Sequence, residues 1–437
     1  MITLRQLRNF WILGVAAMVL ACFSNAVAQT HYKVQDLGVQ HPDNLGMPMG
    51  LNNHGWTLNM EQFLDPFSLS TEFPAVSGTD SITIGHINLE LGTLGGANSS
   101  INWNGINDPG EAVGMSETAA LDPNGEDICF FGTHHVCLPF LWKDGVMTAL
   151  PTVGGVNGQA SAINNKGQVA GYAENGTADS TCYPGTENFM IDLPVVWEKV
   201  HGQIQAQALP TIGTDKDGVA YGINNKGQAV GYSGTFVAVN SGVLWENNMA
   251  TQLPGLGQTP AIAYEINDRG QIVGQGVTSD GVPLATLWEN NTVTALGGGE
   301  LPPGDVASFA TSINNRGQAV GSSFNSDNAS WSHGLLWQNG VMYDLNTLFP
   351  ESSHLFVVNA SNINDSGQIA GMALETVGPH AYQIVHGFLA TPVKEDMGKS
   401  VADVIRTHPQ ITLPAAHVGN RLSPRSAHRS IHDQGIF

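Results

Sequence analysis

The nine residues INDRGQIVG, Ile266–Gly274, are the clearest copy of a phrase that recurs along the chain. The other copies are INDPGEAVG from Ile106, INNKGQVAG from Ile163, INNKGQAVG from Ile223, INNRGQAVG from Ile313, INDSGQIAG from Ile363 and a degenerate first copy, LNNHGWTLN, from Leu51. The copies recur at intervals of about 50 residues, which is typical of a repeat architecture. The phrase therefore predicts one structural unit per copy.

The centre of the phrase has the chemistry of a tight turn. Asn and Asp side chains bond to the local backbone, and glycine adopts the positive φ that closes a hairpin. We expect this role for six glycines: Gly110, Gly167, Gly227, Gly270, Gly317 and Gly367. The flanking residues favour β-structure, so each copy predicts two antiparallel strands.

A second phrase predicts two more strands per unit: FLWKDGVMTAL from Phe140, VLWENNMATQL from Val243, TLWENNTVTAL from Thr286 and LLWQNGVMYDL from Leu335. Asp144-Gly145 and Asn339-Gly340 are two-residue hairpin turns that match the strand twist. The Leu-Trp pair puts apolar groups on both faces of its strand, so both faces must be covered. Four-stranded units stacked radially achieve this, which predicts an all-β propeller of about seven blades.

The two ends of the repeat predict how the ring closes. A strand-like segment, Tyr32–Leu37, precedes the first phrase, and the last unit lacks a fourth strand after Phe388. Unpaired strand edges invite aggregation. We therefore expect the N-terminal strand to complete the seventh blade beside the strand around Phe388. Six blades are the alternative if the weak unit from Phe73 to Leu91 is not a blade.

The N-terminus has the pattern of a secretory signal. Arg5 and Arg8 precede an apolar run that ends at Phe23, and Ala26-Val27-Ala28 is a small-residue cleavage site. The run is shorter than the roughly 20 residues that a spanning helix needs. We expect a secreted or periplasmic protein without a transmembrane segment in the mature chain; a lipoprotein anchored through Cys22 is the alternative.

These patterns divide the chain into three parts. Residues 1–28 are the predicted signal peptide, residues 29–393 form a single repeat-built domain, and residues 394–437 form a polar tail that we expect to be disordered.

The chain is strongly acidic, with 16 Lys and Arg against 37 Asp and Glu and a formal net charge of −21. Such a surface repels nucleic acids and anionic membranes, so neither is an expected partner. Within residues 29–393 the arginines are Arg269 and Arg316, both in the variable slot of the turn. A sialidase clamps a carboxylate with several arginines, and this composition excludes that activity.

Three cysteines follow the predicted cleavage site. Cys129 and Cys137 are close enough to form a disulfide across a loop in an oxidising compartment, which leaves Cys182 unpaired. His134 and His135 lie between the pair, so a zinc site is the alternative, although it needs a fourth ligand and reduced thiols. We expect the disulfide, and neither a metal nor another cofactor.

Two residues break the repeat in a way that indicates binding. Glu265 precedes the Ile of the fifth copy, where other copies have Gly, Ala, Ser or Asn. Inner strands of a propeller line its channel, so Glu265 is a candidate ligand-binding residue; a tolerated edge variation is the alternative. Trp331, outside the repeated Trp position, is a candidate for stacking on a sugar, with filling a gap beneath a loop as the alternative.

Other polar groups have structural explanations. Asp215–Gly218 resembles a fragment of a calcium-binding loop, but an exposed turn explains it. His333 and His386 occupy matching positions and are expected to hold strands by hydrogen bonds. A neutral-sugar hydrolase needs two facing carboxyl groups, whereas most acids here lie in turns or loops. The sequence therefore assigns no catalytic residue.

The repeated IN-x-x-GQ-x-x-G and LW-x-x-G phrases resemble the HAF family of extracellular repeat proteins over residues 32–391. The naming His-Ala-Phe triplet is kept in part, at His333-Gly334-Leu335 and His386-Gly387-Phe388. The resemblance implies export and repeat architecture and supplies no activity.

We expect a secreted, non-enzymatic binding or interaction propeller, because the repeat supplies a rigid ring with variable loops. Its extracellular ligand, carbohydrate or protein, is unknown. The alternatives are an extracellular polysaccharide hydrolase or lyase and a structural envelope or matrix component.

Overall fold

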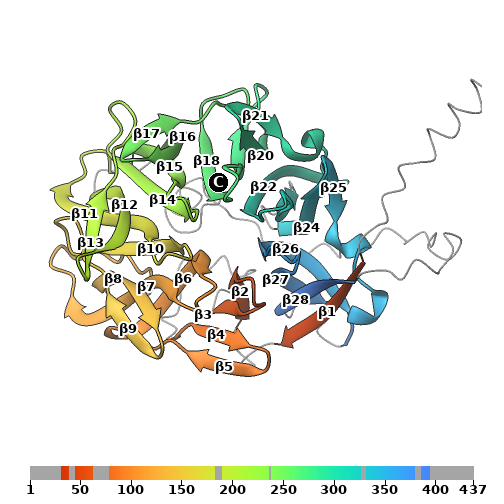
Figure 1. Ribbon diagram of the computed structural model, residues 1–437, viewed down its shortest axis with the longest axis horizontal. Helices are drawn as coiled ribbons and strands as arrows, with labels where there is room; N and C mark the ends of the chain where they lie inside the picture. Colours follow the sequence, from red (N-terminus) through yellow and green to blue (C-terminus); the bar gives the residue numbers. More distant parts are fainter. Residues whose placement is uncertain are drawn as a thin grey trace, which may run out of the picture.

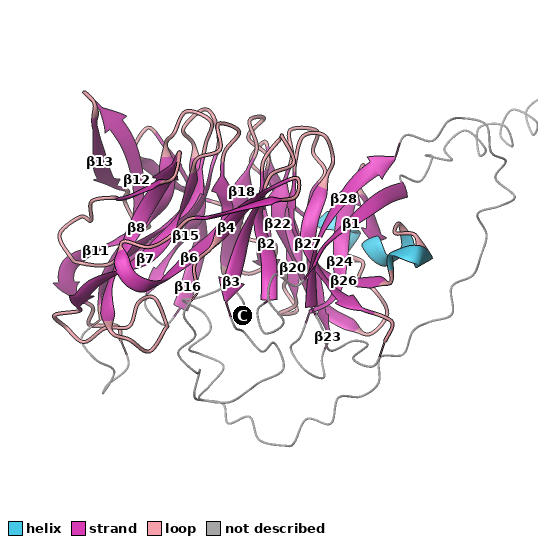
Figure 2. Cartoon of the chain, turned by 90° about the horizontal axis from the view of Figure 1, so that it is seen from below, coloured by secondary structure: helices cyan, strands magenta, loops and turns pink. Residues whose placement is uncertain are grey.

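A computed structural model describes residues 31–38, 45–62, 78–182, 189–235, 238–325, 331–378 and 385–393. These residues form seven four-stranded antiparallel sheets in a ring around a central axis (Figure 1; Figure 2). The fold is therefore the predicted all-β propeller with seven blades, and the six-blade alternative is wrong. The described residues contain no helix long and apolar enough to cross a bilayer. The predicted signal peptide and tail lie outside the described residues.

In blades 1 to 6, four consecutive strands run outward from the axis. Blades 1 and 2 contain β2 (Leu45–Leu51), β3 (Thr57–Gln62), β4 (Ser81–Ile84), β5 (Ile87–Glu90), β6 (Gly95–Ile106), β7 (Ala112–Leu121), β8 (His135–Lys143) and β9 (Val146–Ala149). Blades 3 and 4 contain β10 (Gly158–Ile163), β11 (Val169–Ala178), β12 (Met190–Val200), β13 (Gln203–Ala208), β14 (Asp217–Ile223), β15 (Ala229–Thr235), β16 (Ala238–Glu246) and β17 (Met249–Gln252). Blades 5 and 6 contain β18 (Ala261–Ile266), β19 (Ile272–Val277), β20 (Pro283–Glu289), β21 (Thr292–Ala295), β22 (Asp305–Ile313), β23 (Ala319–Asn325), β24 (Trp331–Gln338) and β25 (Val341–Asp344).

Blade 7 closes the ring with strands from both ends of the domain. Its members are β26 (Leu355–Ile363), β27 (Ile369–Glu375), β28 (Val385–Val393) and, outermost, β1 (His31–Gly38). β1 pairs antiparallel with β28, which confirms the predicted closure by the N-terminal strand. Three short 3-10 helices lie in links between blades. η1 (Leu296–Gly299) connects blades 5 and 6, and η2 (Leu345–Thr347) and η3 (Glu351–Ser353) lie between blades 6 and 7.

The repeated phrase forms the turn between the first two strands of each blade. In blade 5, Asn267 Oδ1 accepts the backbone N–H groups of Arg269 and Gln271, each at 3.0 Å, and Gly270 donates its N–H to the Asn267 carbonyl. Gly270 has a φ of +82°, and the other five predicted turn glycines have φ between +76° and +83°. All seven turns therefore lie at one end of the inner strands, which we call the turn face; the opposite end is the loop face.

The first Asn of the phrase also joins neighbouring blades. Asn267 Nδ2 donates to the Asn314 carbonyl of the next turn at 3.0 Å, and the equivalent bond forms at all seven junctions. The next residue of the phrase makes a second ring, in which its N–H donates to the side-chain oxygen of its counterpart in the next turn. The bond from Asp365 to Asn53 joins the last turn to the degenerate first one. Two closed hydrogen-bond rings thus fix the inner strands at the turn face.

The Leu-Trp strand packs between blades. Trp245 is fully buried, and its Nε1 donates to the Pro210 carbonyl at 2.8 Å, in the link from the preceding blade. Its hydrophobic cluster combines side chains of blades 3 and 4, among them Ala170 and Val243. Each core therefore lies between two blades, which is why the strand needs apolar residues on both faces.

Replacing Gly270 by Val is expected to destabilise the domain by about 1–3 kcal/mol, because a β-branched residue is strained at positive φ. Nothing lies within 4 Å of the added Cβ, so the cost comes from the backbone alone. Arg269→Val changes the exposed variable slot of the same turn and is expected to be nearly neutral. Urea unfolding measures both variants, and equal midpoints would contradict the turn described above.

Candidate functional site

A polar cavity lies on the propeller axis, just inside the turn face. We call it the cup. Its volume is about 90 Å³, and it is lined by Leu51, Asn104, Ile106, Ala162, Ile163, Ile223, Glu265, Ser312, Asn362 and Ile363. It opens outward into a mouth of about 140 Å³ between the seven turns. The polar lining comes from the residue before the Ile of the phrase in blades 5, 6 and 7, together with Asn104 of blade 2.

Glu265 is the acidic residue of the cup. It lies on β18 and is half-buried, and its carboxyl group accepts hydrogen bonds from the Ile313 backbone N–H and the Ser312 hydroxyl of the next blade. Burial raises the pKa of Glu265 to about 7, and the nearby Asp365 carboxylate adds to the rise, while the two hydrogen bonds oppose it. Near neutral pH, both the charged and the neutral form of this carboxyl group are therefore populated.

Two asparagines in the lining of the cup contact each other directly. Asn362 Nδ2 donates to Asn104 Oδ1 at 2.7 Å. Asn362 Oδ1 and Asn104 Nδ2 are buried and have no hydrogen-bond partner among the described residues. Asn104 also has a φ of +64°, the left-handed region that non-glycine residues rarely adopt. The lining of the cup therefore includes an unpartnered acceptor on β26 and an unpartnered donor on β6.

Aromatic rings fill the channel on the loop-face side of the cup. Trp103 of blade 2 packs against Tyr264 of blade 5, with ring centroids 5.5 Å apart, and Tyr264 also contacts Tyr221 and Phe309. These side chains belong to one buried cluster. Because these side chains meet across the axis, the cluster that they form separates the cup from the loop face.

Trp331, the second candidate from the sequence, does not join this site. It is the first residue of β24 and its backbone pairs with Phe324 at the loop-face end of blade 6. Glu265 pairs with Val273 near the turn face. The two candidates thus lie at opposite ends of the propeller, and the side chain of Trp331 is outside the described residues.

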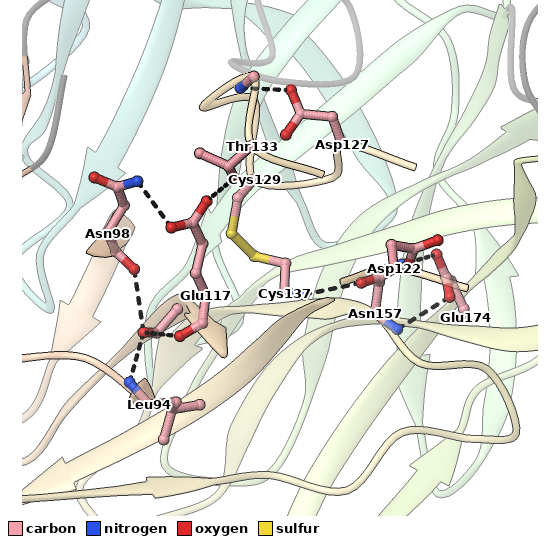
Figure 3. Close-up of a disulfide and its surroundings, with 12 residues drawn as sticks. Leu94, Asn98, Glu117, Asp122, Asp127, Cys129, Thr133, Cys137, Asn157 and Glu174 are labelled. Carbon is pink, nitrogen blue, oxygen red and sulfur yellow. Dashed lines mark hydrogen bonds between the residues drawn. A yellow bond between two sulfur atoms is a disulfide. The ribbon is translucent and has the colours of Figure 1, made fainter. Parts of the chain in front are cut away.

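Cys129, in the segment between β7 and β8, forms the predicted disulfide with Cys137 on β8 (Figure 3). Their Cα atoms are 5.8 Å apart, and the bond uses both thiols that the zinc alternative requires. Cys182 is free and half-buried, and burial raises the pKa of its thiol to about 12. This thiol is therefore a poor nucleophile at neutral pH.

Three buried acids surround one amide beside the disulfide, a feature that the sequence analysis missed. Asn157 Nδ2 donates to Asp122 and Glu174, each at 2.8 Å (Figure 3). It also lies 3.5 Å from Glu126. Asn157 Oδ1 accepts the Cys137 backbone N–H at 2.9 Å, which ties the cluster to the disulfide. Burial, reinforced by repulsion from Glu174, raises the pKa of Glu126 to about 7.

Asp192 extends this acidic cluster into the next strand. It lies directly opposite Glu174 in the β11–β12 pairing, and its N–H donates to Asp217 at 3.1 Å. Its Oδ1 has no hydrogen-bond partner among the described residues. Burial, together with the surrounding acids, raises the pKa of Asp192 well above its usual value. The signal available in the sequence was the acid three residues after the phrase, as in Glu174.

Asp215–Gly218 is not the exposed turn that the sequence predicts, because Asp217 and Gly218 are buried at the start of β14. Asp215 accepts hydrogen bonds from Ser233 and Asn240, at 2.8 and 2.7 Å. Throughout the described ranges, no three His, Cys, Asp or Glu side chains are arranged to hold a metal ion.

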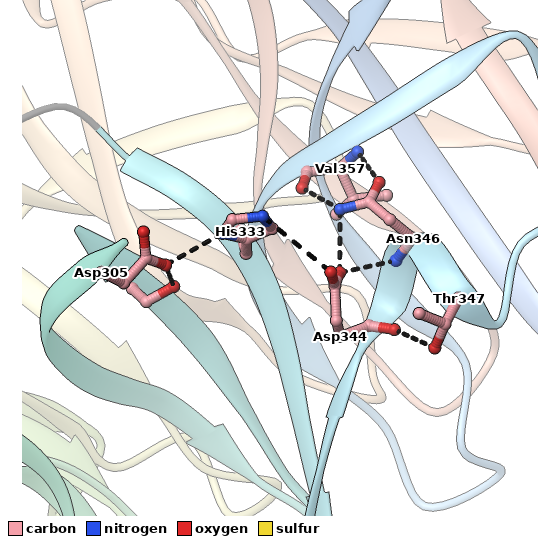
Figure 4. A network of polar contacts seen from close by, with 7 residues as sticks. Asp305, His333, Asp344, Asn346, Thr347 and Val357 are labelled. Carbon is pink, nitrogen blue, oxygen red and sulfur yellow. Dashed lines mark hydrogen bonds and ion pairs between the residues drawn. The ribbon is translucent and has the colours of Figure 1, made fainter. Parts of the chain in front are cut away.

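The two histidines at matching positions bridge strands, as the sequence predicts. His333 Nδ1 lies 2.9 Å from Asp305, and its Nε2 lies 4.0 Å from Asp344 (Figure 4). His386 contacts Asp36 at 3.0 Å, which links β28 to the closing strand β1. The hydrogen bond to Asp36 raises the pKa of His386, against the opposing effect of burial.

These features define a seven-bladed propeller with a polar cavity on its axis. The chain matches no protein-family model and no curated protein. Among solved structures it resembles virginiamycin B lyase from Staphylococcus aureus (12% identity, TM-score 0.43, 83% of this chain and 100% of that one) and a gluconolactonase from Xanthomonas campestris (8%, 0.38, 84% and 93%). It also resembles YCF48 bound to a D1 peptide (11%, 0.43, 85% and 100%). At these scores the likenesses carry no inference about ligand or activity.

Proposed function

We propose that the protein is a secreted, non-enzymatic binding propeller and that the cup is its binding site. The cup itself carries the proposal, because it combines the Glu265 carboxyl group with the unpartnered polar atoms of Asn104 and Asn362. A buried polar atom without a partner costs roughly 1–3 kcal/mol. A ligand that satisfies these atoms recovers that free energy on binding.

The arrangement of acids favours binding over hydrolysis. Glycoside hydrolysis requires two carboxyl groups on opposite sides of the substrate. Glu265 is the acid that lines the cup, and the neighbouring Asp365 is engaged in the turn ring, where it accepts the Asn315 N–H at 2.7 Å. The lining of the cup therefore contains one carboxyl group and no second one to share acid-base catalysis.

Export and family membership belong to the same proposal. The basic and apolar pattern of residues 1–28 supports secretion. The seven copies of the turn phrase, each of which forms the same hydrogen-bonded unit, support membership of the HAF family.

Binding without turnover is the expected result when the exported chain is screened on a glycan and peptide array and incubated in parallel with extracellular polysaccharides. Glu265→Gln is expected to weaken binding at least about tenfold, because it removes the charged acceptor of the cup. Glu300→Gln, an exposed acid, is the matched control. Release of saccharide products that Glu265→Gln abolishes would instead make the protein a hydrolase or lyase.

A further inference from the structure

Phe130 is an exposed apolar residue in a strained backbone conformation. Its φ of +60° lies in the left-handed region, and 41% of its surface is exposed. Among the described residues, every other non-glycine residue with a positive φ is Asn, Asp or His, the types that tolerate this region best. The phenylalanine therefore adds backbone strain and leaves apolar surface in water, a combination that is typical of functional positions.

The residues beside Phe130 are anchored, so its ring is presented on a rigid loop. Cys129 and Phe131, on either side of it, are buried in one apolar cluster with Cys137. The disulfide joins Cys129 to Cys137 on β8 (Figure 3). Phe130 itself donates its N–H to the Asp127 carbonyl at 3.1 Å. A residue that is held rigidly before binding loses little conformational entropy when it binds a partner.

The same loop exposes further apolar side chains. β7 ends in Ala119, Ala120 and Leu121, which are all exposed. Leu121, at 69%, is the most exposed large apolar residue in the part of the chain that the structure describes. We call residues 119–137 the stapled loop. Exposed apolar groups that gather on one segment are typical of an interaction site.

The stapled loop lies on the loop face, where the charge is strongly negative. Lys216 is the only Lys or Arg on this face among the described residues, whereas Asp36, Asp280 and Glu351 are exposed there. The other described cations lie toward the turn face: Lys33, Lys143, Lys166, Lys199, Lys226, Arg269 and Arg316. The loop face therefore attracts a cationic partner and repels anionic bilayers and the loop face of a second copy.

We propose that the stapled loop docks a basic, amphipathic segment of a protein partner. Phe130 and Leu121 pack against the apolar side chains of that segment, and the negative loop face attracts its lysines or arginines. The stapled loop and the cup lie at opposite ends of the propeller. This surface is therefore a second site, which goes beyond the binding function proposed for the cup.

Fluorescence anisotropy tests the proposal on the exported chain, with a labelled synthetic peptide that alternates pairs of lysines with pairs of leucines. We expect saturable binding that weakens at least about tenfold when the salt concentration rises from about 50 mM to about 500 mM. Phe130→Asn and Leu121→Ser are each expected to weaken binding at least about tenfold. The matched control is Val146→Ser, which is expected to leave binding unchanged, because Val146 is 62% exposed but lies at the turn face.

The melting temperature of Phe130→Asn separates a docking role from a structural one. Asparagine tolerates a positive φ better than phenylalanine does, so we expect the melting temperature to stay unchanged or to rise while peptide binding falls. A lower melting temperature would show that the ring serves packing within the protein, and a peptide affinity equal to that of the unaltered protein would show that the ring does not dock. Either result would make the proposal wrong.

Other results would also overturn the proposal. One is equal binding of a peptide in which glutamate replaces every lysine. Another is saturable binding to phosphatidylcholine vesicles that Phe130→Asn abolishes, which would make the stapled loop a lipid anchor. A dimer in sedimentation that the same variant disrupts would place a second copy on this surface. None of these results bears on the cup, which Glu265→Gln tests separately.

Discussion

Deletion of residues 29–38, which contain β1, is expected to lower the free energy of unfolding of the domain by on the order of 5 kcal/mol or more. β1 supplies the fourth strand of blade 7 and pairs with β28 from His31 to Gly38. Tyr32 is 3% exposed and packs against Phe349, with ring centroids 6.1 Å apart. The loss is comparable with the 5–15 kcal/mol that stabilises a typical domain. Thermal and urea unfolding measure it.

Deletion of residues 398–437 is the control, because this segment is part of the polar tail with few large apolar residues, and we expect it to leave the melting temperature unchanged. The deletion of β1 also removes Asp36, the partner of His386, and uncovers the edge of β28. A shortened chain that melts at the same temperature as the full one would show that β1 does not close the ring.

Asp192→Asn is expected to stabilise the domain above neutral pH by on the order of 1–3 kcal/mol, which raises the melting temperature by a few degrees. Asp192 lies opposite Glu174 and close to Asp217 and Glu126. Lys216, next to Asp217 in the chain, donates to Ser180. Like charges placed opposite each other in a sheet destabilise it. The amide removes one charge and adds a donor among carboxylates.

The direction of the pH dependence follows from the raised pKa values. Burial raises the pKa of Glu126 to about 7 and that of Asp192 well above its usual value, so the folded protein holds protons that the unfolded chain releases above about pH 4 to 4.5. The two acids contribute most to the stability of the fold below about pH 4 to 4.5. This contribution is lost as the pH rises, and for Glu126 the loss is centred on a pH of about 7. The unaltered protein is therefore expected to be less stable at pH 8 than at pH 5.

The difference in stability between variants at the same pH isolates the effect of the acidic cluster. His386, whose pKa is raised by Asp36, loses its contribution as the pH rises and changes stability in the same direction. Each pH is therefore compared between the unaltered protein, Asp192→Asn and the exposed-acid control Asp280→Asn. An Asp192→Asn variant that is destabilised at pH 8 would mean that the carboxylate makes a needed contact.

Strands, turns and ring closure could be predicted from the sequence because each depends on local chemistry that is repeated. Gly270 and its equivalents mark a turn by their backbone freedom, and the Leu-Trp pair requires a neighbour on both faces. The closing strand could be predicted by counting the strands of each unit, since one extra strand precedes the first unit and the last unit lacks its fourth strand. The Cys129–Cys137 disulfide followed from short spacing.

Only one residue of the candidate site could be identified from the sequence. Glu265 breaks a repeated pattern, which identifies it without any structure. Asn362 and Asn104 are 258 positions apart, and they meet because the closed ring brings blades 2 and 7 to the same cavity. The contacts of the two hydrogen-bond rings could not be predicted either, although the Asn and Asp residues that form them all stand in the repeated phrase.

The sequence by itself thus determined the blade, because the residues of a blade are neighbours in the chain and their hydrogen bonds follow from turn chemistry and strand alternation. Only the tertiary structure decided the cup and the acidic cluster. Both form between blades, where Asn157 meets Asp122 and Glu126 across 35 and 31 positions. Such contacts depend on the curvature and register with which whole sheets pack around the axis, and no local pattern encodes these.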